Sequence, residues 1–318
     1  MGACGEPRVR GVVVNLNGGA YIEEALESLR QQDYANLVTV VVDNGSHDAS
    51  VEGIRSRFPE VHIVENGRNL GFGGANNVGM QLALDEEDSF VFLLNYDATV
   101  SPSCVRTLVQ RALSSGAGMV GPKIFYHNNP ALIWSAGGTV QWRRGGVAHR
   151  GIRQRDHGQF DECMDVDYLT ACAVLIDTEA LRKVGMFDDA YFPSYFEDAD
   201  LCHRARRAGF RLVYEPAAAA WHRVSSHSGG GTTPLKVTLR LRNQLIFFRR
   251  YAAWYHWVTI PFCASFAAAG FVVRCLLEGR WQLVRAVGHG LRAALASGSR
   301  ESSRNEGRMT GPKVQRKG

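Results

Sequence analysis

Three carboxylates lie within four residues of one another, in a run of aromatic and small apolar side chains. The run reads Tyr195-Phe196-Glu197-Asp198-Ala199-Asp200-Leu201-Cys202, and apolar residues recur every third position to Ala205. With Ser194 as N-cap, this spacing predicts a helix whose first turn holds Glu197 and Asp198. One acid there would satisfy free backbone amides and the helix dipole. Two adjacent acids among aromatic residues indicate a functional site.

Polar clusters also follow three of the predicted strands directly. Valine- and leucine-rich runs at 9–15, 37–42, 61–64 and 90–94 alternate with helical spacing, which predicts an α/β fold with a mostly parallel sheet and helices on both faces. Ligands bind beyond the carboxyl ends of such strands. The clusters there are Asn15-Leu16-Asn17, Asp43-Asn44 and Asn95-Tyr96-Asp97. Three clusters at one sheet edge favour a nucleotide-sized ligand.

A glycine-rich stretch, Gly71-Phe72-Gly73-Gly74-Ala75-Asn76, follows the third predicted strand. A dinucleotide fingerprint would follow the first strand and end in glycine or alanine, so a Rossmann dehydrogenase is excluded. We expect a loop that either presents backbone amides to a phosphate through Gly71 and Gly73 or packs as a turn on the sheet.

Later segments complete the expected site. Residues 130–165 are rich in glycine, arginine and polar residues and predict a loop or flap over the site, followed by a strand at 166–170. His222 lies 24 residues after Asp198, beyond one predicted helix and a strand that reaches Tyr214. A chain folding back in this way returns His222 to the mouth of the site, as a metal ligand or as a structural histidine.

The charge of the chain is unevenly distributed. The net charge of +5 combines an acidic front part, with a balance of −7 over residues 1–235, and a basic part from Lys236 onward, with 15 Lys/Arg against 3 Asp/Glu. A basic tail attracts nucleic acid or an anionic membrane. Seven scattered cysteines without a CxxC pair, and no apolar leader, favour a reducing cytoplasmic setting.

The tail contains an uncharged run. A helix is predicted from Thr238 to Arg250, and residues 251–273 then hold no Lys, Arg, Asp or Glu. Such a run fits a spanning helix, an interfacial segment or a buried helix pair, and the flanking arginines favour attachment to an anionic membrane surface. We therefore expect a catalytic domain over 1–234, a membrane-associating helical region over 235–297 and a disordered basic tail over 298–318.

Several of these stretches occur together, and in the same order, in one enzyme family. The chain resembles the inverting family 2 glycosyltransferases of GT-A fold, in particular their bacterial rhamnosyltransferase-like branch, over roughly residues 8–230. The matching stretches are Val12 to Asn15, Val42 to Ser46, Asn69 to Asn77, Leu93 to Asp97, Phe187-Asp188, Glu197 to Leu201, and Trp221-His222.

The resemblance implies roles for the polar residues. Asp43 would contact the base of a nucleotide-sugar, with Asn15 and Asn44 in the same pocket. Asp97 matches the last acid of the family's D-x-D motif and would hold Mg²⁺ or Mn²⁺ on the diphosphate, with His222 as a second ligand. Asp198 would be the general base, with Glu197 beside it.

The chain departs from the full D-x-D motif because its first position is Asn95. A neutral amide oxygen is a weaker donor for a hard cation than a carboxylate, so tight metal binding is expected only with the nucleotide present.

The expected function is transfer of a sugar from a nucleotide-diphosphate donor to a hydroxyl of a lipid-linked or polysaccharide acceptor, with inversion. The resemblance points to rhamnose from dTDP-rhamnose, used in cell-surface glycan synthesis at the cytoplasmic face of the inner membrane by a peripheral or single-pass protein. Alternatives are a metal-dependent sugar nucleotidyltransferase, which would need a basic loop after the first strand, and a lipid- or nucleic-acid-binding module in the basic tail. The uncharged aromatic run favours lipid over nucleic acid.

Overall fold

The computed structural model describes residues 5–224 and 231–309, with side chains as far as residue 296. Residues 5–141 and 147–224 form one compact unit, and residues 142–146 and 231–309 form a second. The domain boundaries expected after residues 234 and 297 stay predictions.

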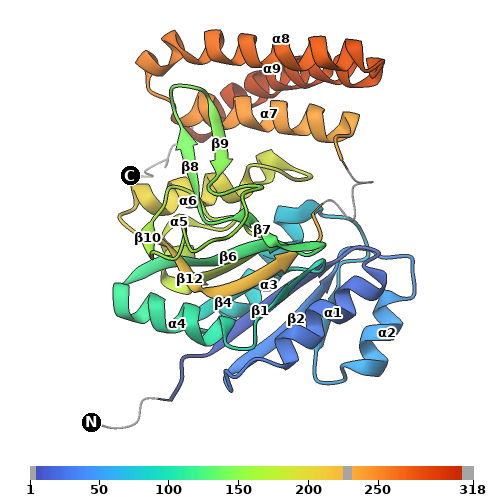
Figure 1. Ribbon diagram of the computed structural model, residues 1–318, viewed down its shortest axis with the longest axis vertical. Helices are drawn as coiled ribbons and strands as arrows, with labels where there is room; N and C mark the ends of the chain where they lie inside the picture. The colour runs from blue at the N-terminus through green and yellow to red at the C-terminus, as the bar shows by residue number, and fades with distance from the viewer. Residues whose placement is uncertain (1–4, 225–230, 310–318) are drawn as a thin grey trace, which may run out of the picture. The chain divides into compact units, whose positions relative to one another are not determined.

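The first unit is built on a sheet of ten described strands (Figure 1). The strands are β1 Val9–Asn15, β2 Leu37–Asp43, β3 His62–Glu65, β4 Phe90–Asn95, β5 Ala98–Val100, β6 Ala117–Tyr126, β7 Asn129–Ser135, β10 Met164–Asp165, β11 Ala173–Asp177 and β12 Arg211–His222. Their order along the main path is β10-β12-β6-β11-β4-β1-β2-β3, with β5 on β12 and β7 on β6. The strands β3, β2, β1 and β4 are parallel, and β11 runs antiparallel to both its neighbours. The predicted α/β class is confirmed, with antiparallel strands added to the parallel half.

Helices cover both faces of this sheet. They are α1 Gly19–Arg30, α2 Ser50–Arg57, α3 Gly71–Asp85, α4 Cys104–Ser115, α5 Thr178–Val184 and α6 Glu197–Arg207, with a 3₁₀ turn at Asp189–Tyr191. Val9 and Val13 of β1 belong to one core with Leu26 of α1 and Leu108 of α4. Val12, which points to the other face, packs so closely on α3 that a Cβ at Gly79 would lie 2.4 Å from it. The alternation of β1 therefore places both helix layers.

The last strand is longer than its sequence suggests. It was expected to end near Tyr214, but β12 continues through Pro216 and the alanines to His222. Its pairing with β6 shifts register between Glu215 and Ala219, and such an irregularity accommodates a proline that cannot donate to the ladder.

The predicted flap over residues 130–165 contains strands. Besides β7, it includes β8 Gly138–Gln141 and β9 Gly146–His149, which pair with each other. The strand predicted over residues 166–170 is wrong, because the segment is irregular apart from a single bridge between Tyr168 and Gly138.

Two predicted helix starts also differ from the structure. Helix α3 begins at Gly71, so the glycine stretch is its first turn and not a loop. Helix α6 has Phe196 as its N-cap, in a left-handed conformation, and the prediction of Ser194 is wrong.

The second unit is helical. It contains α7 Pro234–Tyr251, a 3₁₀ turn at Trp254–Val258, α8 Ile260–Leu277 and α9 Trp281–Met309. The uncharged run 251–273 is thus not one continuous helix, since α7 ends at Tyr251 and Pro261 lies in the first turn of α8. The bounds of α9 extend into residues 298–318, the segment that was predicted to be disordered. Residues 310–318 lie outside the described residues.

Candidate active site

The strand register brings three of the predicted polar residues to one edge of the sheet. Asn15 pairs with Asp43 across β1 and β2, and Val14 pairs with Asn95 across β1 and β4. The side-chain nitrogen Nδ2 of Asn15 donates to Asp43 Oδ1 at 2.9 Å, and Asn15 Oδ1 accepts the backbone amide of Gly18 at 3.1 Å. These side chains lie close together, as expected, because the carboxyl ends of parallel strands meet at one edge of the sheet.

Asp43 holds the turn that follows β2. Its Oδ2 accepts the backbone amides of Gly45 and Ser46, each at 3.1 Å, in addition to the Asn15 bond on Oδ1. Gly45 has φ +84°, and a Cβ there would lie 3.0 Å from the backbone of Arg68. A carboxylate offers about four acceptor positions, so Asp43 retains capacity for about one more donor, such as a nucleobase N–H.

Asn44 supports helix α3. Its amide nitrogen donates to Asn69 Oδ1 at 3.0 Å and to the Gly71 carbonyl at 3.3 Å, while its oxygen accepts the Leu70 amide at 2.8 Å. The side chain is 2% exposed. Asn44 therefore fixes the start of α3 against β2, and its expected contact with the donor stays a prediction.

The glycines of α3 admit the acidic segment. A Cβ on Gly71, whose φ is +75°, would lie 2.8 Å from both the Phe192 ring and the Pro193 carbonyl oxygen. A Cβ on Gly73 would lie 3.2 Å from Phe187 Cβ and 3.9 Å from Glu197 Cβ. The Phe72 amide donates to the Pro193 carbonyl at 2.7 Å. Glycine is thus needed here for close packing of α3 on the segment that leads into α6.

Asp97 and His222 lie together, as the sequence suggested they could. Antiparallel pairing of β5 with β12 sets His222 opposite Ala98, and His222 Nε2 lies 3.2 Å from Asp97 Oδ1. Both side chains are buried. The Trp134 ring of β7 packs edge-on against the His222 ring, with centroids 4.5 Å apart, and fixes its orientation.

Glu197 and Asp198 have different surroundings. Glu197 is buried, and its Oε2 has no hydrogen-bond partner among the described residues. Half-buried Asp198 accepts the Tyr168 hydroxyl at 2.7 Å and the Ala171 amide at 3.3 Å on Oδ2, and the Ala199 amide at 2.8 Å on Oδ1. Burial raises the pKa of both carboxyls. At Glu197 the charge of Asp198 adds to this rise, which is large. At Asp198 the hydrogen bonds from Tyr168, Ala171 and Ala199 oppose the rise. Burial and the neighbouring charge therefore favour the protonated form of Glu197, while the hydrogen bonds favour the ionised form of Asp198.

The third acid of the run has a structural partner. Asp200 is fully buried, pairs with Arg204 at 2.7 Å and accepts the Tyr191 hydroxyl at 3.0 Å. Arg204 in turn donates to the Met186 carbonyl at 2.7 Å. This network holds the acidic segment against its own helix.

Cys172 links the two acidic groups. Its pKa is raised well above the ordinary value by burial first, and then by the charges of both Asp97 and Asp198. Its carbonyl also accepts the Asn95 amide at 2.8 Å. Asp97 and Asp198 are therefore both near enough to Cys172 for their charges to act on its thiol, next to the carboxyl end of β4.

Sequence reasoning missed a set of aromatic residues in this site. Trp134 contacts both His222 and His149, the latter with ring centroids 4.7 Å apart, and His149 lies 5.5 Å from the Tyr168 ring. These contacts run from Asp97 to Asp198. No motif marked them, because they come from the segment predicted to be a flap and from the irregular segment at 166–170.

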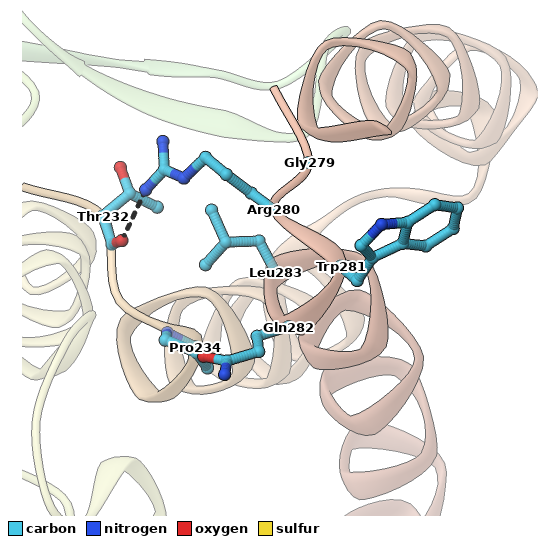
Figure 2. Close-up of a pocket in the computed structure, with 7 residues that line it drawn as sticks. All are labelled: Thr232, Pro234, Gly279, Arg280, Trp281, Gln282 and Leu283. Carbon is cyan, nitrogen blue, oxygen red and sulfur yellow. Dashed lines mark hydrogen bonds between the residues drawn. The ribbon is translucent and has the colours of Figure 1, made fainter. Parts of the chain in front are cut away.

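Two cavities among the described residues differ in size and position. The smaller, of about 10 Å³, lies between α3 and the acidic segment and is lined in part by Gly73, Asp188 and Glu197. It has room for about one water molecule. The larger, of about 440 Å³, is in the helical unit (Figure 2), and its lining residues Thr232, Pro234, Gly279, Arg280, Trp281, Gln282 and Leu283 include no carboxylate that could act as a base.

The sequence and the fold both resemble those of known proteins. The sequence profile of Glycosyl transferase family 2 matches residues 12–185. N-acetylglucosaminyl-diphospho-decaprenol L-rhamnosyltransferase of Mycobacterium tuberculosis is 28% identical over 268 residues, which cover 77% of this chain and 85% of that protein.

Two solved structures share the fold. S. aureus TarS in complex with UDP-GlcNAc has a TM-score of 0.58 and 18% identity, over 90% of this chain and 81% of that one. The mannosyltransferase PcManGT of Pyrobaculum calidifontis, in complex with GDP-Man and Mn²⁺, has a TM-score of 0.57 and 16% identity, over 95% and 81%. Since the family profile spans more than half of the sequence, this chain belongs to glycosyl transferase family 2 and is a glycosyltransferase of GT-A fold.

Proposed function

We propose that the protein transfers rhamnose from dTDP-rhamnose, with inversion, to a hydroxyl of a lipid-linked or polysaccharide acceptor in cell-surface glycan synthesis. The donor and acceptor classes rest on the mycobacterial relative, whose name specifies L-rhamnose transfer to a diphospho-decaprenol-linked sugar. The observation that carries the proposal is the arrangement around Cys172, with the Asp97–His222 pair on one side and hydrogen-bonded Asp198 on the other.

Asp198 is the general base in this proposal. Its carboxylate takes the proton of the acceptor hydroxyl while that oxygen forms a bond to the anomeric carbon of the donor sugar. The bond from the anomeric carbon to the diphosphate breaks on the opposite face, and the nucleoside diphosphate leaves with the electron pair. A single displacement of this kind inverts the anomeric configuration. Protonated Glu197 beside Asp198 adds no second negative charge next to the attacking oxygen.

The donor would lie along the strand ends. Asp43 and Asn15 would face the nucleobase, and Asn95 with Asp97 would face the diphosphate. Gly71 and Gly73 would act through packing, because they set the distance between α3 and the acidic segment.

Asp97 and His222 fit a divalent cation that is completed by substrate. Carboxylate and imidazole donors suit Mn²⁺, and Mg²⁺ is commonly held by one or two carboxylates together with substrate phosphates. In the described residues no group of three or more His, Cys, Asp and Glu side chains could hold a metal alone. When bound, Mg²⁺ or Mn²⁺ would neutralise charge on the departing diphosphate.

The test is a transfer assay on the purified full-length protein. dTDP-rhamnose, UDP-GlcNAc and GDP-mannose are each supplied with a synthetic polyprenyl-diphosphate-linked GlcNAc, with Mg²⁺, with Mn²⁺ or with EDTA. Of the three donors, we expect only dTDP-rhamnose to add a deoxyhexose to the acceptor, as seen by mass spectrometry. EDTA should abolish the product, and NMR should show an inverted anomeric centre. Transfer from another donor would overturn the rhamnose assignment, and retained configuration would overturn the single displacement.

We also propose that the helical unit attaches the enzyme to the cytoplasmic face of the membrane. Helix α8 is apolar on almost all sides, and its outward side chains include Phe262 and Phe266, which are 76% and 80% exposed. The segment His256–Leu277 is apolar and long enough to cross a membrane. Exposed Arg285 and Arg292 lie one and three turns into α9, where they would meet anionic headgroups.

An in-plane position suits this unit better than a span. Helix α8 is packed near both of its ends, since Ile260 and Cys275 are buried, and the Arg280 amide donates to the Cys275 carbonyl in the turn that leads into α9. Helix α9 packs on α8 and carries arginines on its exposed side. Because charged side chains are costly inside a bilayer, α8 could span the membrane only by separating from α9. Figure 1 shows α7, α8 and α9 side by side within this unit.

Vesicle flotation tests the attachment. Phe262→Ser with Phe266→Ser should weaken binding to vesicles that contain anionic lipid by at least about 100-fold, since each buried phenylalanine contributes about 1.5–3 kcal/mol. The control is Leu113→Ser, which changes a residue that is 60% exposed on α4 of the other unit. Unchanged binding of the double variant, or equal loss in the control, would contradict attachment through α8.

A further inference from the structure

We propose that Tyr168 is the positioning residue of the base: its hydroxyl occupies Asp198 Oδ2, so that Oδ1 is the atom that receives the acceptor proton. This inference rests on the proposed role of Asp198 as general base. It assigns a function to a residue outside every motif discussed above.

Tyr168 is held in place by its backbone and by a glycine. Its amide donates to the Gly138 carbonyl at 3.2 Å, and its ring lies against β8, where a Cβ on Gly138 would be 2.6 Å from Tyr168 Cδ1 and 2.8 Å from the Ala148 carbonyl oxygen. The other side of the ring faces His149. The side chain is buried, so its hydroxyl is committed to the 2.7 Å bond with Asp198.

The donors on Asp198 are unequally divided between its oxygens. Oδ2 accepts two, the Tyr168 hydroxyl and the Ala171 amide, both from the segment before β11. Among the other described residues one donor reaches Oδ1, the Ala199 amide of the same helix. Since each carboxylate oxygen has about two acceptor positions, Oδ1 retains one for the acceptor hydroxyl.

The titratable groups that face Asp198 are Tyr168, Glu197, Cys172 and Cys202. Burial raises the pKa of all four, which favours the uncharged form of each group around Asp198. The Tyr168 hydrogen bond stabilises the ionised carboxylate of Asp198 and so offsets part of the rise in pKa that burial causes. Removing the bond should therefore raise that pKa and reduce the fraction of enzyme with an ionised base at low pH.

The experiment is the pH profile of kcat/KM for Tyr168→Phe in the full-length enzyme. We expect the acid limb to move to higher pH by about one unit, the size of one charge-assisted hydrogen bond, with the rate on the alkaline plateau within a few-fold of wild type. The matched control is Tyr214→Phe, which removes a buried hydroxyl that donates to the Phe160 carbonyl at 2.9 Å. Its acid limb should stay in place.

A second substitution gives the opposite sign and keeps the size of the side chain. 3,5-Difluorotyrosine introduced at position 168 is a stronger hydrogen-bond donor, so the acid limb should move to lower pH. A structural role alone would lower the rate equally at every pH. The inference is overturned if the limb stays in place in the variant or variants that fold.

Asp198→Asn separates this inference from the proposed function. If that variant retains transfer, the base assignment fails and takes the role of Tyr168 with it. If it loses transfer while the Tyr168 variants keep the wild-type pH profile, only the role of Tyr168 is wrong.

Discussion

Replacing Gly71 by alanine should separate the acidic segment from α3. Gly71 has φ +75°, and an alanine Cβ would lie 2.8 Å from the Pro193 carbonyl oxygen and from the Phe192 ring. The ring can rotate, but the carbonyl belongs to backbone that is also bonded to the Phe72 amide. The clash must therefore move the segment that carries Glu197 and Asp198.

The expected magnitude has two parts. A left-handed conformation costs alanine about 1–2 kcal/mol, and overpacking against backbone adds about 1–3 kcal/mol. Gly67 provides the matched control, because its φ is +65° and its added Cβ would meet nothing within 4 Å. Gly67→Ala should carry the first cost only.

The assay is thermal unfolding combined with kcat/KM. We expect Gly71→Ala to unfold several degrees below Gly67→Ala, at about 2–4 °C per kcal/mol for a unit of this size, and to lose at least about tenfold in kcat/KM while Gly67→Ala keeps its activity. Equal melting temperatures and equal activities for the two variants would refute the claim that close packing at Gly71 positions the acids.

Two further substitutions test the electrostatics of the site. Glu197→Gln puts a neutral isostere in place of an acid whose pKa is raised, and it should keep most of the transfer activity. Because the folded-state pKa of Glu197 is raised, the stability that this group contributes is full below its unfolded pKa and falls as pH rises toward the folded pKa. In urea unfolding the variant should therefore gain stability relative to wild type as pH rises from the unfolded pKa of a glutamate, and a difference that stays constant with pH would contradict the raised pKa of Glu197. Asp97→Ala and His222→Ala should each weaken the binding of dTDP-rhamnose in the presence of Mn²⁺ and leave its binding without metal unchanged, as measured by calorimetry. If Mn²⁺ strengthens donor binding by a variant as much as it does for wild type, the replaced residue is not part of the cation site.

Much of the fold could be read from the sequence, because β1 to β4 and their helices have clear periodicities. The bounds of β1 agree with the expectation, and the polar residues at the strand ends meet as parallel strands require. Helix α3 was expected to start later since four of its first five residues are glycine or alanine; packing on β1 and on the acidic segment, which only small residues allow, overrides the low helix propensity of glycine.

Other features depend on contacts that local sequence does not encode. The continuation of β12 past Pro216 requires β6 as a partner on one side and β5 on the other. Tyr168 reaches Asp198 because Gly138, thirty residues earlier, leaves room for its ring. Neither long-range contact has a spacing that a single sequence could reveal, and the same holds for the packing of Trp134 on His222.

Sugar transfer by Asp198→Asn, measured together with donor binding, tests the proposed role of the acidic helix most sharply. The substitution keeps the shape of the side chain and removes the proton acceptor. We expect kcat to fall by about 10²–10⁴-fold, with the Kd for dTDP-rhamnose unchanged. Transfer at a near wild-type rate would contradict Asp198 as the base, and with it the assignment of the acidic helix as the catalytic element.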